Sequence, residues 1–382
     1  MKENWEVKKL GEVCEVIAGQ SPEGKYYNNT GEGLPFYQGK KEFTDKYIGK
    51  PTTWTTSITK EAQENDILMS VRAPVGPVNF STEKICIGRG LAAIRPSKFI
   101  DKEYLFNFLL KHENEIVGNA GAVFNSINKT QIQNISIPLP SLPEQQRIVS
   151  ILDETFAAID KAKENAEKNL QNARELFESH LQSVFSNSGN GWERKKLGKI
   201  SVVNMGQSPK GSSYNTTGDG VPLINGPVEF GGDDPFSKTL KTKFTTEPTK
   251  MCKQGDLILC VRGSTTGRMN IAGFDSCIGR GVASISSAEY QDWINQYINF
   301  NRDTIYKLGT GATFPNVSSS TLSNLLIPIP PKEQQHSIVA KLDALSAETK
   351  NLETIYQQKL AALDELKKSV LQKAFSGELT GA

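Results

Sequence analysis

Histidine and cysteine are scarce in this chain, with 3 and 5 residues among 382. The cysteine count is odd and no CxxC pair occurs. A disulfide framework or a structural zinc is therefore not expected, and a reducing, cytoplasmic setting is. No apolar run reaches the roughly 18 residues of a membrane-spanning helix, and the first residues lack the apolar core of a signal peptide. We expect no membrane association.

Sequence motifs of catalysis are also missing. The chain has no phosphate-binding GxxxxGK loop, no GxGxxG, no HExxH and no GxSxG. Asp234-Pro235-Phe236 is faintly similar to the acidic-proline-aromatic motif of amino-group methyltransferases, but it lacks the second proline and is interpreted as a turn. We therefore predict a chain that is not an enzyme and binds no cofactor or metal of its own. With 44 basic and 42 acidic residues, the charge balance neither requires nor excludes a nucleic-acid partner.

What the sequence does contain is one unit written twice. The segment Trp5–Gly11 returns as Trp192–Gly198, 187 residues later. Cys86–Gly90 returns as Cys277–Gly281, at an offset of 191. No acid or base recurs beside Cys86 and Cys277, so these two are interpreted as small buried residues. The duplication covers nearly the whole chain, and the drift in offset indicates a few loop insertions.

Each repeat begins with a globule of mixed character. Short apolar segments at Ile67–Val71 and Leu257–Val261 predict buried strands, whereas Glu103–Glu115 and Asp292–Asp303 predict helices. Loops are expected at Asn28–Pro35 and Asn215–Pro222, which are rich in Gly, Asn and Thr. The fold class is therefore α+β, with two tandem globules of α/β type.

Each repeat ends in a long amphipathic stretch. Residues 144–185 contain neither Gly nor Pro, and the second copy places apolar residues in alternating steps of three and four. A helix of about 40 residues is roughly 60 Å long, so two such helices are expected to pair as an antiparallel coiled coil, with packing on the preceding globule as the alternative. The predicted seam consists of Leu152, Ile159, Leu342, Leu345, Leu352, Leu363, Leu366 and Val370. The expected domains are residues 1–143 and 189–331 for the globules, and 144–188 and 332–382 for the helices.

Polar residues recur at matching loop positions of the two globules. Arginine suits guanine edges and phosphates, and Asn or Gln suits adenine edges, so these residues are candidates for DNA contacts. Loops that differ between the copies are candidates for encoding two unlike half-sites. Together the candidates are Gln20, Ser21, Tyr27, Asn28, Gln38, Lys40, Lys41, Arg72, Arg89 and Asn125 in the first half, and Gln207, Ser208, Tyr214, Asn215, Asn225, Arg262, Thr265, Arg268, Arg280 and Asn316 in the second.

With these features the chain resembles the specificity subunit of type I restriction–modification systems. The resemblance rests on the duplicated W-E-x-K-K-L-G segment, the strands ending in Val-Arg, the domain ends 137–149 and 327–339, and the closing segment Leu371–Leu379. It implies two target-recognition domains that read a bipartite double-stranded DNA sequence, and helices that space them and dock two methyltransferase subunits. Those partners would use S-adenosylmethionine, and added restriction subunits would use ATP and Mg²⁺. The family pattern is broken where His336-Ser337 replaces the Gln146-Arg147 of the first copy.

Two other functions stay open at this point. A two-headed scaffold whose globules bind protein rather than DNA would share the duplication and the missing catalytic groups. A DNA methyltransferase or nuclease acting by itself would need a cofactor loop, which the sequence lacks.

Overall fold

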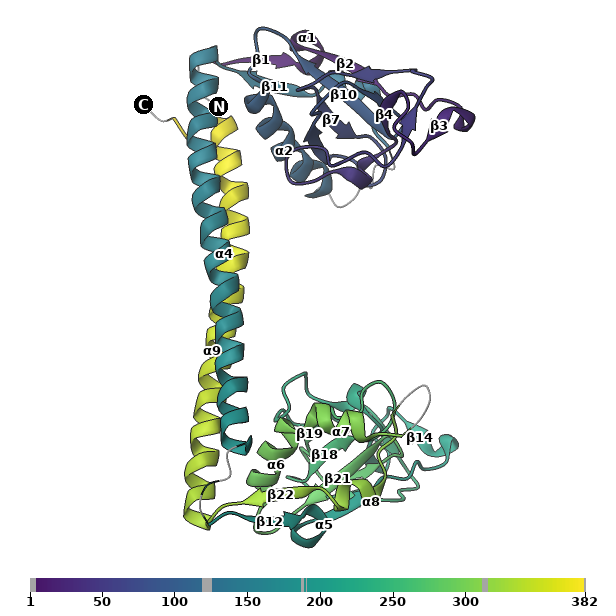
Figure 1. Ribbon diagram of the computed structural model, residues 1–382, viewed down its shortest axis with the longest axis vertical. Helices are drawn as coiled ribbons and strands as arrows, with labels where there is room; N and C mark the ends of the chain where they lie inside the picture. The colour runs from purple at the N-terminus through teal and green to yellow at the C-terminus, as the bar shows by residue number, and fades with distance from the viewer. Residues whose placement is uncertain (1–4, 119–125, 187–188, 190, 311–314, 381–382) are drawn as a thin grey trace. The chain divides into compact units, whose positions relative to one another are not determined.

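The computed structural model describes residues 5–118, 126–186, 189, 191–310 and 315–380. The chain divides into two compact units, one formed by residues 1–168 with 356–382 and the other by residues 169–355. Each unit contains one α+β globule and the adjoining parts of two long helices (Figure 1). The duplication seen in the sequence is thus a duplication of structure.

The first globule is built on three sheets. Its antiparallel four-stranded sheet has the order β2-β10-β7-β8, and its five-stranded sheet has the order β3-β5-β4-β9-β6, in which β4 and β9 are parallel. The third is the pair β1-β11, which brings the two ends of the globule together. The bounds are β1 Glu6–Lys9, α1 Leu10–Val13, β2 Cys14–Ala18, β3 Tyr27–Asn28, β4 Leu34–Tyr37, β5 Trp54–Thr55, β6 Glu61–Ala62, β7 Ile67–Ser70, β8 Val78–Phe80, β9 Ile85–Ile87, β10 Leu91–Pro96, α2 Lys102–Gly118, α3 Lys129–Gln133 and β11 Ser136–Leu139.

The second globule repeats this topology strand for strand. Its sheets have the orders β13-β21-β18-β19, β14-β16-β15-β20-β17 and β12-β22. Helix α2 of the first globule corresponds to two shorter helices in the second, α6 and α7. They are separated at Asn301, whose backbone is not helical. The bounds are β12 Glu193–Lys196, α5 Leu197–Ile200, β13 Val202–Met205, β14 Tyr214–Asn215, β15 Val221–Ile224, β16 Phe244–Thr245, β17 Met251–Cys252, β18 Leu257–Cys260, β19 Met269–Ile271, β20 Ser276–Ile278, β21 Val282–Ser286, α6 Gln291–Phe300, α7 Arg302–Leu308, α8 Ser319–Ser323 and β22 Leu326–Ile329.

The central strands are buried on both faces, which explains why they appear in the sequence as continuous apolar runs. All four residues of β7 and of β18 are buried, which confirms the two strands expected at these positions. Cys86 and Cys277 are also fully buried, as expected. In each globule an aromatic side chain of a helix donates a hydrogen bond to the last strand. Tyr104 Oη of α2 donates to the carbonyl of Pro138 in β11, and Trp293 Nε1 of α6 donates to that of Pro328 in β22, both at 2.8 Å.

The drift in the repeat offset comes largely from one loop. In the first globule Gly49 donates its N–H to the carbonyl of Glu42, and Phe80 donates to Lys46. In the second globule Leu240 donates to Glu229, and Ile271 donates to Ser237. Glu42 to Lys46 therefore corresponds to Glu229 to Ser237, so the second copy carries four additional residues. The added residues lie within Gly231–Phe236, which we call the insertion loop.

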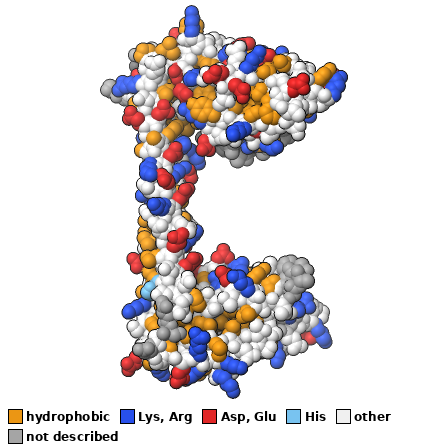
Figure 2. Space-filling model, in the orientation of Figure 1, with side chains coloured by type: hydrophobic (Ala, Val, Ile, Leu, Met, Phe, Trp, Pro, Cys, Tyr) orange, Lys and Arg blue, Asp and Glu red, His pale blue; other side chains and the backbone are white. Residues whose placement is uncertain are grey.

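The long helices are α4, Leu142–Ser186, and α9, Lys332–Ser376. Within each unit the two run antiparallel and side by side (Figure 1). In the first unit Lys367 Nζ lies 3.8 Å from Asp160 Oδ1, and in the second unit Arg174 Nε donates to Glu353 Oε1 at 2.8 Å. Acidic and basic side chains lie next to one another along the helix pair (Figure 2). The structure confirms the predicted coiled coil within each unit.

The helix ends also pack on the globules, so both packing modes considered from the sequence occur. Ile148, Leu152 and Phe375 join the core of the first globule. Leu181, Phe185 and Leu342 join that of the second. Between these ends the buried positions on α4 include Ala166 and Ala173.

The predicted seam residues differ in burial, and one of them is exposed. Leu152, Ile159, Leu342 and Val370 are buried, and Leu345, Leu352 and Leu363 are partly buried. Leu366 is 47% exposed. Its place is taken by Lys367, whose ammonium lies 4.9 Å from the centroid of the Phe156 ring. The α-helical period of 3.6 residues moves the contact face away from a strict repeat of 3.5, and a lysine stem can cover apolar surface while its charge stays in water.

Candidate nucleic-acid interface

The centre of the candidate site in the first globule is the turn Gly88-Arg89-Gly90, which follows β9. Because β4 and β9 are parallel, the residues after both strands lie at the same sheet edge. Gly88 donates its N–H to Tyr37 at 2.8 Å and Gly90 donates to Gln38 at 3.1 Å. A Cβ at position 90 would lie 2.4 Å from the Gln38 carbonyl oxygen, so only glycine fits there. This close approach places Gln38 beside Arg89.

Two further loops reach the same turn. The N–H of Arg89 donates to Ser21 Oγ at 3.2 Å, and Gln20 donates its N–H to the carbonyl of Ile87 at 3.0 Å. Val71 donates its N–H to Gly90 at 3.0 Å, which brings the adjacent Arg72 to this edge. Gln20, Gln38, Arg72 and Arg89 are exposed, and we call them the first polar edge.

The first polar edge is chemically available. Within the described part of the chain, no hydrogen bond or ion pair engages the guanidinium of Arg72 or Arg89. An arginine without an internal carboxylate partner leaves all of its donors for a ligand. Two such guanidinium groups beside two exposed glutamine amides form a surface suited to DNA phosphates and to the major-groove edges of bases.

The second globule builds the same arrangement from the equivalent residues. Arg280 donates its N–H to Ser208 Oγ at 3.2 Å, Gly279 donates to Ile224 at 2.8 Å, and Val261 donates to Gly281 at 3.0 Å. The second polar edge consists of Gln207, Asn225, Arg262 and Arg280. Arg262 also pairs through its backbone with Asn316, as Arg72 does with Ser126. The framework is the same, and Asn225 stands where the first globule has Gln38.

Other predicted contact residues make hydrogen bonds within their own loops. Tyr27 Oη donates to the carbonyl of Pro22 at 2.9 Å, and Tyr214 Oη donates to that of Pro209 at 3.2 Å. Asn28 Oδ1 accepts from the N–H of Thr30 and Glu32, and Asn215 Oδ1 does the same for Thr217 and Asp219. These side chains hold the loop in shape, as asparagine often does in turns. Ser21 and Ser208 likewise act through the arginine turns.

The two globules also differ beside the polar edges. Lys40 and Lys41 are exposed on a short 3₁₀ helix, and the corresponding residues are Pro227 and Val228, the latter 82% exposed. Arg268 Nη2 pairs with Asp233 Oδ1 at 2.6 Å, and its N–H donates to the carbonyl of Thr265 at 3.0 Å. Arg268 is therefore engaged within the globule. Asn125 lies outside the described residues.

Sequence reasoning missed a pair of buried asparagines behind the site. Asn79 Oδ1 accepts from the N–H of Thr44 at 2.8 Å, and Nδ2 of the corresponding Asn270 donates to Ser237 Oγ at 2.6 Å. Each holds the loop that follows the 3₁₀ helix. Their recurrence at the offset of 191 was a signal that could have identified them.

Two buried thiols of the globules are chemically inert. Burial raises the pKa of the Cys14 and Cys260 thiols to about 12, which keeps both protonated and unreactive. No cluster of three or more histidine, cysteine or acidic side chains suited to a metal occurs among the described residues. Over the same ranges no helix is long and apolar enough to cross a membrane.

Comparison with known proteins agrees with this picture. The family described as type I restriction modification DNA specificity domain matches residues 2–169 and 189–361. The chain is 30% identical to the putative type I restriction enzyme MjaX specificity subunit of Methanocaldococcus jannaschii, over 99% of this chain and 94% of that protein. It is 24% identical to the EcoKI specificity subunit of Escherichia coli K12, over 77% of this chain and 69% of that one.

Solved structures share the fold. A chain from a study of complex assembly and conformational transition of the type I R-M system matches with a TM-score of 0.85 at 24% identity, covering 99% of both chains. The HsdS subunit of Thermoanaerobacter tengcongensis matches with a TM-score of 0.69, also at 24% identity, over 99% of this chain and 98% of that one.

Proposed function

Because the chain belongs to the family of type I restriction–modification DNA specificity subunits, we propose that each of its globules reads one half of a bipartite DNA target through its polar edge. The observation that carries this proposal is the duplicated turn that presents Arg89 in one globule and Arg280 in the other. The copies agree in the framework that holds the arginine and differ in the neighbouring side chains. This arrangement would let the two globules recognise two different half-site sequences.

Within each polar edge we assign different tasks to different residues. Arg89, Arg280 and the amides Gln20, Gln38, Gln207 and Asn225 read base edges. Arg72 and Arg262 contact base edges or phosphates, and Lys40 and Lys41 contact phosphates. A base-reading residue affects one sequence position, whereas a phosphate contact affects all sequences alike and contributes to the salt dependence of binding.

The partners follow from the family. The chain is the non-catalytic component of a multisubunit system. We propose that α4 and α9 dock two methyltransferase subunits, that restriction subunits join through these, and that S-adenosylmethionine, ATP and Mg²⁺ are bound by those partners. Chromosomal DNA as the target would place the complex in the cytoplasm. The comparisons do not favour the two-headed protein scaffold considered from the sequence.

We further propose that the helix pair sets the spacer between the half-sites. Seven residues added to a helix lengthen it by about 10 Å, close to the rise of three base pairs of DNA. The test inserts seven residues at facing positions, after Glu167 in α4 and after Lys359 in α9, which preserves the contact faces. The complex with its methyltransferase partner is then expressed in a host, and the methylated sequences are mapped.

The expected map shows both half-sites unchanged and a spacer longer by about three base pairs. An insertion in α4 alone serves as the control, because it displaces the two contact faces against each other and should lower methylation without producing a new spacer. Altered half-sites with an unaltered spacer would contradict this assignment of the helices.

A further inference from the structure

The insertion loop has no counterpart in the first globule, and it is anchored firmly in its own. Asn270 is fully buried and donates through Nδ2 to Ser237 Oγ, just after the loop. Arg268 pairs with Asp233 at 2.6 Å, and the N–H of Phe236 donates to Asp234 Oδ1 at 3.1 Å. The Phe236 ring packs against the core of the second unit. The loop is thus a fixed projection of the globule.

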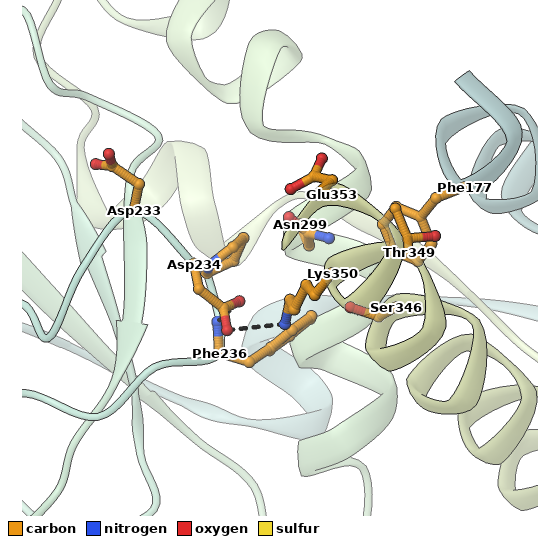
Figure 3. Close-up of a pocket in the computed structure, with 10 residues that line it drawn as sticks. Phe177, Asp233, Asp234, Phe236, Asn299, Ser346, Thr349, Lys350 and Glu353 are labelled. Carbon is orange, nitrogen blue, oxygen red and sulfur yellow. Dashed lines mark hydrogen bonds and ion pairs between the residues drawn. The ribbon is translucent and has the colours of Figure 1, made fainter. Parts of the chain in front are cut away.

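This projection reaches helix α9. Lys350 Nζ lies 2.8 Å from Asp234 Oδ2, as the dashed line in Figure 3 marks. A cavity of about 320 Å³ beside the pair is lined by Phe177, Ser346 and Thr349, among others. A second cavity of about 530 Å³ shares Phe236, Ser346 and Lys350 with the first. The ion pair therefore links the insertion loop to α9 beside open space, and the Phe236 ring lines both cavities together with Ser346 and Lys350 of α9.

In the first unit the residues at the equivalent positions have other partners. The helix residue that corresponds to Lys350 is Asp160, and it faces Lys367 of the other helix at 3.8 Å. The shorter loop of the first globule carries Lys46, which pairs with Glu103 of α2 at 2.9 Å. Burial opposes the charge of Lys46, but the bond to Glu103 outweighs it and raises the pKa of this lysine. Among the described residues of the first unit, no ion pair within 4 Å joins this loop to a long helix, and the nearest counterpart is the weaker attraction between Lys46 and Asp153 of α4, which also raises the pKa of Lys46.

We propose that Asp234 and Lys350 are positioning residues that fix the orientation of the second recognition domain on the helix pair and thereby enforce a single spacer length. This inference rests on the proposed reading of a bipartite target. One base pair added to the spacer displaces the second half-site by about 3.4 Å and rotates it by roughly 35°. A domain held in one orientation rejects such a site. A domain released from α9 can follow it.

The test measures methylation of duplexes that carry both half-sites with the native spacer, or with one base pair more or fewer. The enzyme is the full complex with its methyltransferase partner. Lys350→Met keeps the aliphatic stem and removes the charge. A second variant deletes Gly232–Pro235 and gives the loop the length found in the first globule. The double variant Asp234→Lys with Lys350→Asp reverses the two charges and tests whether a restored ion pair recovers the native spacer preference.

For Lys350→Met we expect methylation of the one-base-pair neighbours, relative to the native spacer, to rise about three- to five-fold, as the modest strength of a part-exposed ion pair implies. The deletion should produce a larger rise, and the reversed pair should return the ratio toward the native value. Asp160→Asn is the matched control, since it removes one charge at the equivalent helix position. It should leave the ratio unchanged.

The proposal is overturned if Lys350→Met and the deletion both keep the native ratio, or if Asp160→Asn raises it equally. Lys350 is 46% exposed in its side chain, so its replacement leaves the fold intact and the result interpretable. Failure of the proposed function has a different signature, because the unmodified complex would then show no preference for any spacer.

Discussion

The backbone N–H of Arg89 donates a hydrogen bond to Oγ of Ser21 across 3.2 Å. Arg280 and Ser208 repeat this relationship at the same distance. In both globules a serine hydroxyl therefore fixes the backbone of an exposed arginine whose guanidinium has no hydrogen bond or ion pair among the described residues. We therefore expect the serines to affect DNA binding indirectly, by holding the backbone of these arginines in place.

Ser21→Ala should weaken binding to targets that contain the first half-site by about five-fold, because one hydrogen bond of roughly 1 kcal/mol is lost and the arginine turn loosens. Competition binding of the complex to duplexes with single-base changes measures this. Discrimination should decline only at positions of the first half-site, and Ser208→Ala should affect only the second. Equal loss for all sequences would assign the turn to phosphate contact.

The difference between Lys41 and Val228 gives a second prediction. If Lys41 contacts a phosphate, Lys41→Val should reduce the slope of log affinity against log salt by about one unit, and Val228→Lys should increase it by about one. Affinities between 50 and 200 mM salt, roughly the range in which such slopes are resolved, provide the measurement. Slopes that remain unchanged in both variants would remove Lys41 from the interface.

The corrected seam predicts two unlike outcomes for the same substitution. Leu152→Ala removes a fully buried side chain and should lower the free energy of unfolding by about 2–5 kcal/mol. Leu366→Ala changes an exposed side chain of the same unit and should cost less than about 0.5 kcal/mol. Thermal or denaturant unfolding of the complex compares them. Similar losses would restore Leu366 to the seam.

The ion pair between Arg95 of β10 and Asp66 in the first globule gives a fourth prediction. Arg95 donates to the buried carboxylate of Asp66 through Nε at 2.9 Å and through Nη2 at 2.8 Å. These bonds raise the pKa of Arg95, against the opposing effect of its burial. Arg95→Ala should lower the free energy of unfolding by about 2 kcal/mol, because the carboxylate loses its charged partner.

Two variants control this result. Adding Asp66→Asn should recover part of the loss, since a neutral amide needs no counter-charge. Ser286→Ala changes the matching position of the second globule, where no arginine is present, and should be nearly neutral. A loss for Arg95→Ala no greater than that of Ser286→Ala would show that solvent already screens the pair.

Much of this fold could be predicted because the chain repeats itself. The strands at Ile67 and Leu257 and the two long helices follow from apolar patterns that are local in the sequence. The roles of Tyr27 and Asn28 could not be predicted, because a polar loop residue looks alike whether it binds DNA or its own backbone. Leu366 was misplaced because a strict seven-residue pattern ignores the helical period. The contact of Asp234 with Lys350 joins residues 116 positions apart and had no pattern to reveal it.

The central claim is that two arginine turns read two separate half-sites, and the methylated sequences of a host carrying the complex test it most directly. Maps would be compared for the unmodified chain, Arg89→Ala and Arg280→Ala, each with its methyltransferase partner. The account predicts that Arg89→Ala relaxes the sequence of one half-site only and Arg280→Ala that of the other, with the spacer unchanged. Relaxation of the same half-site by both substitutions, or no change of sequence in either, would contradict it.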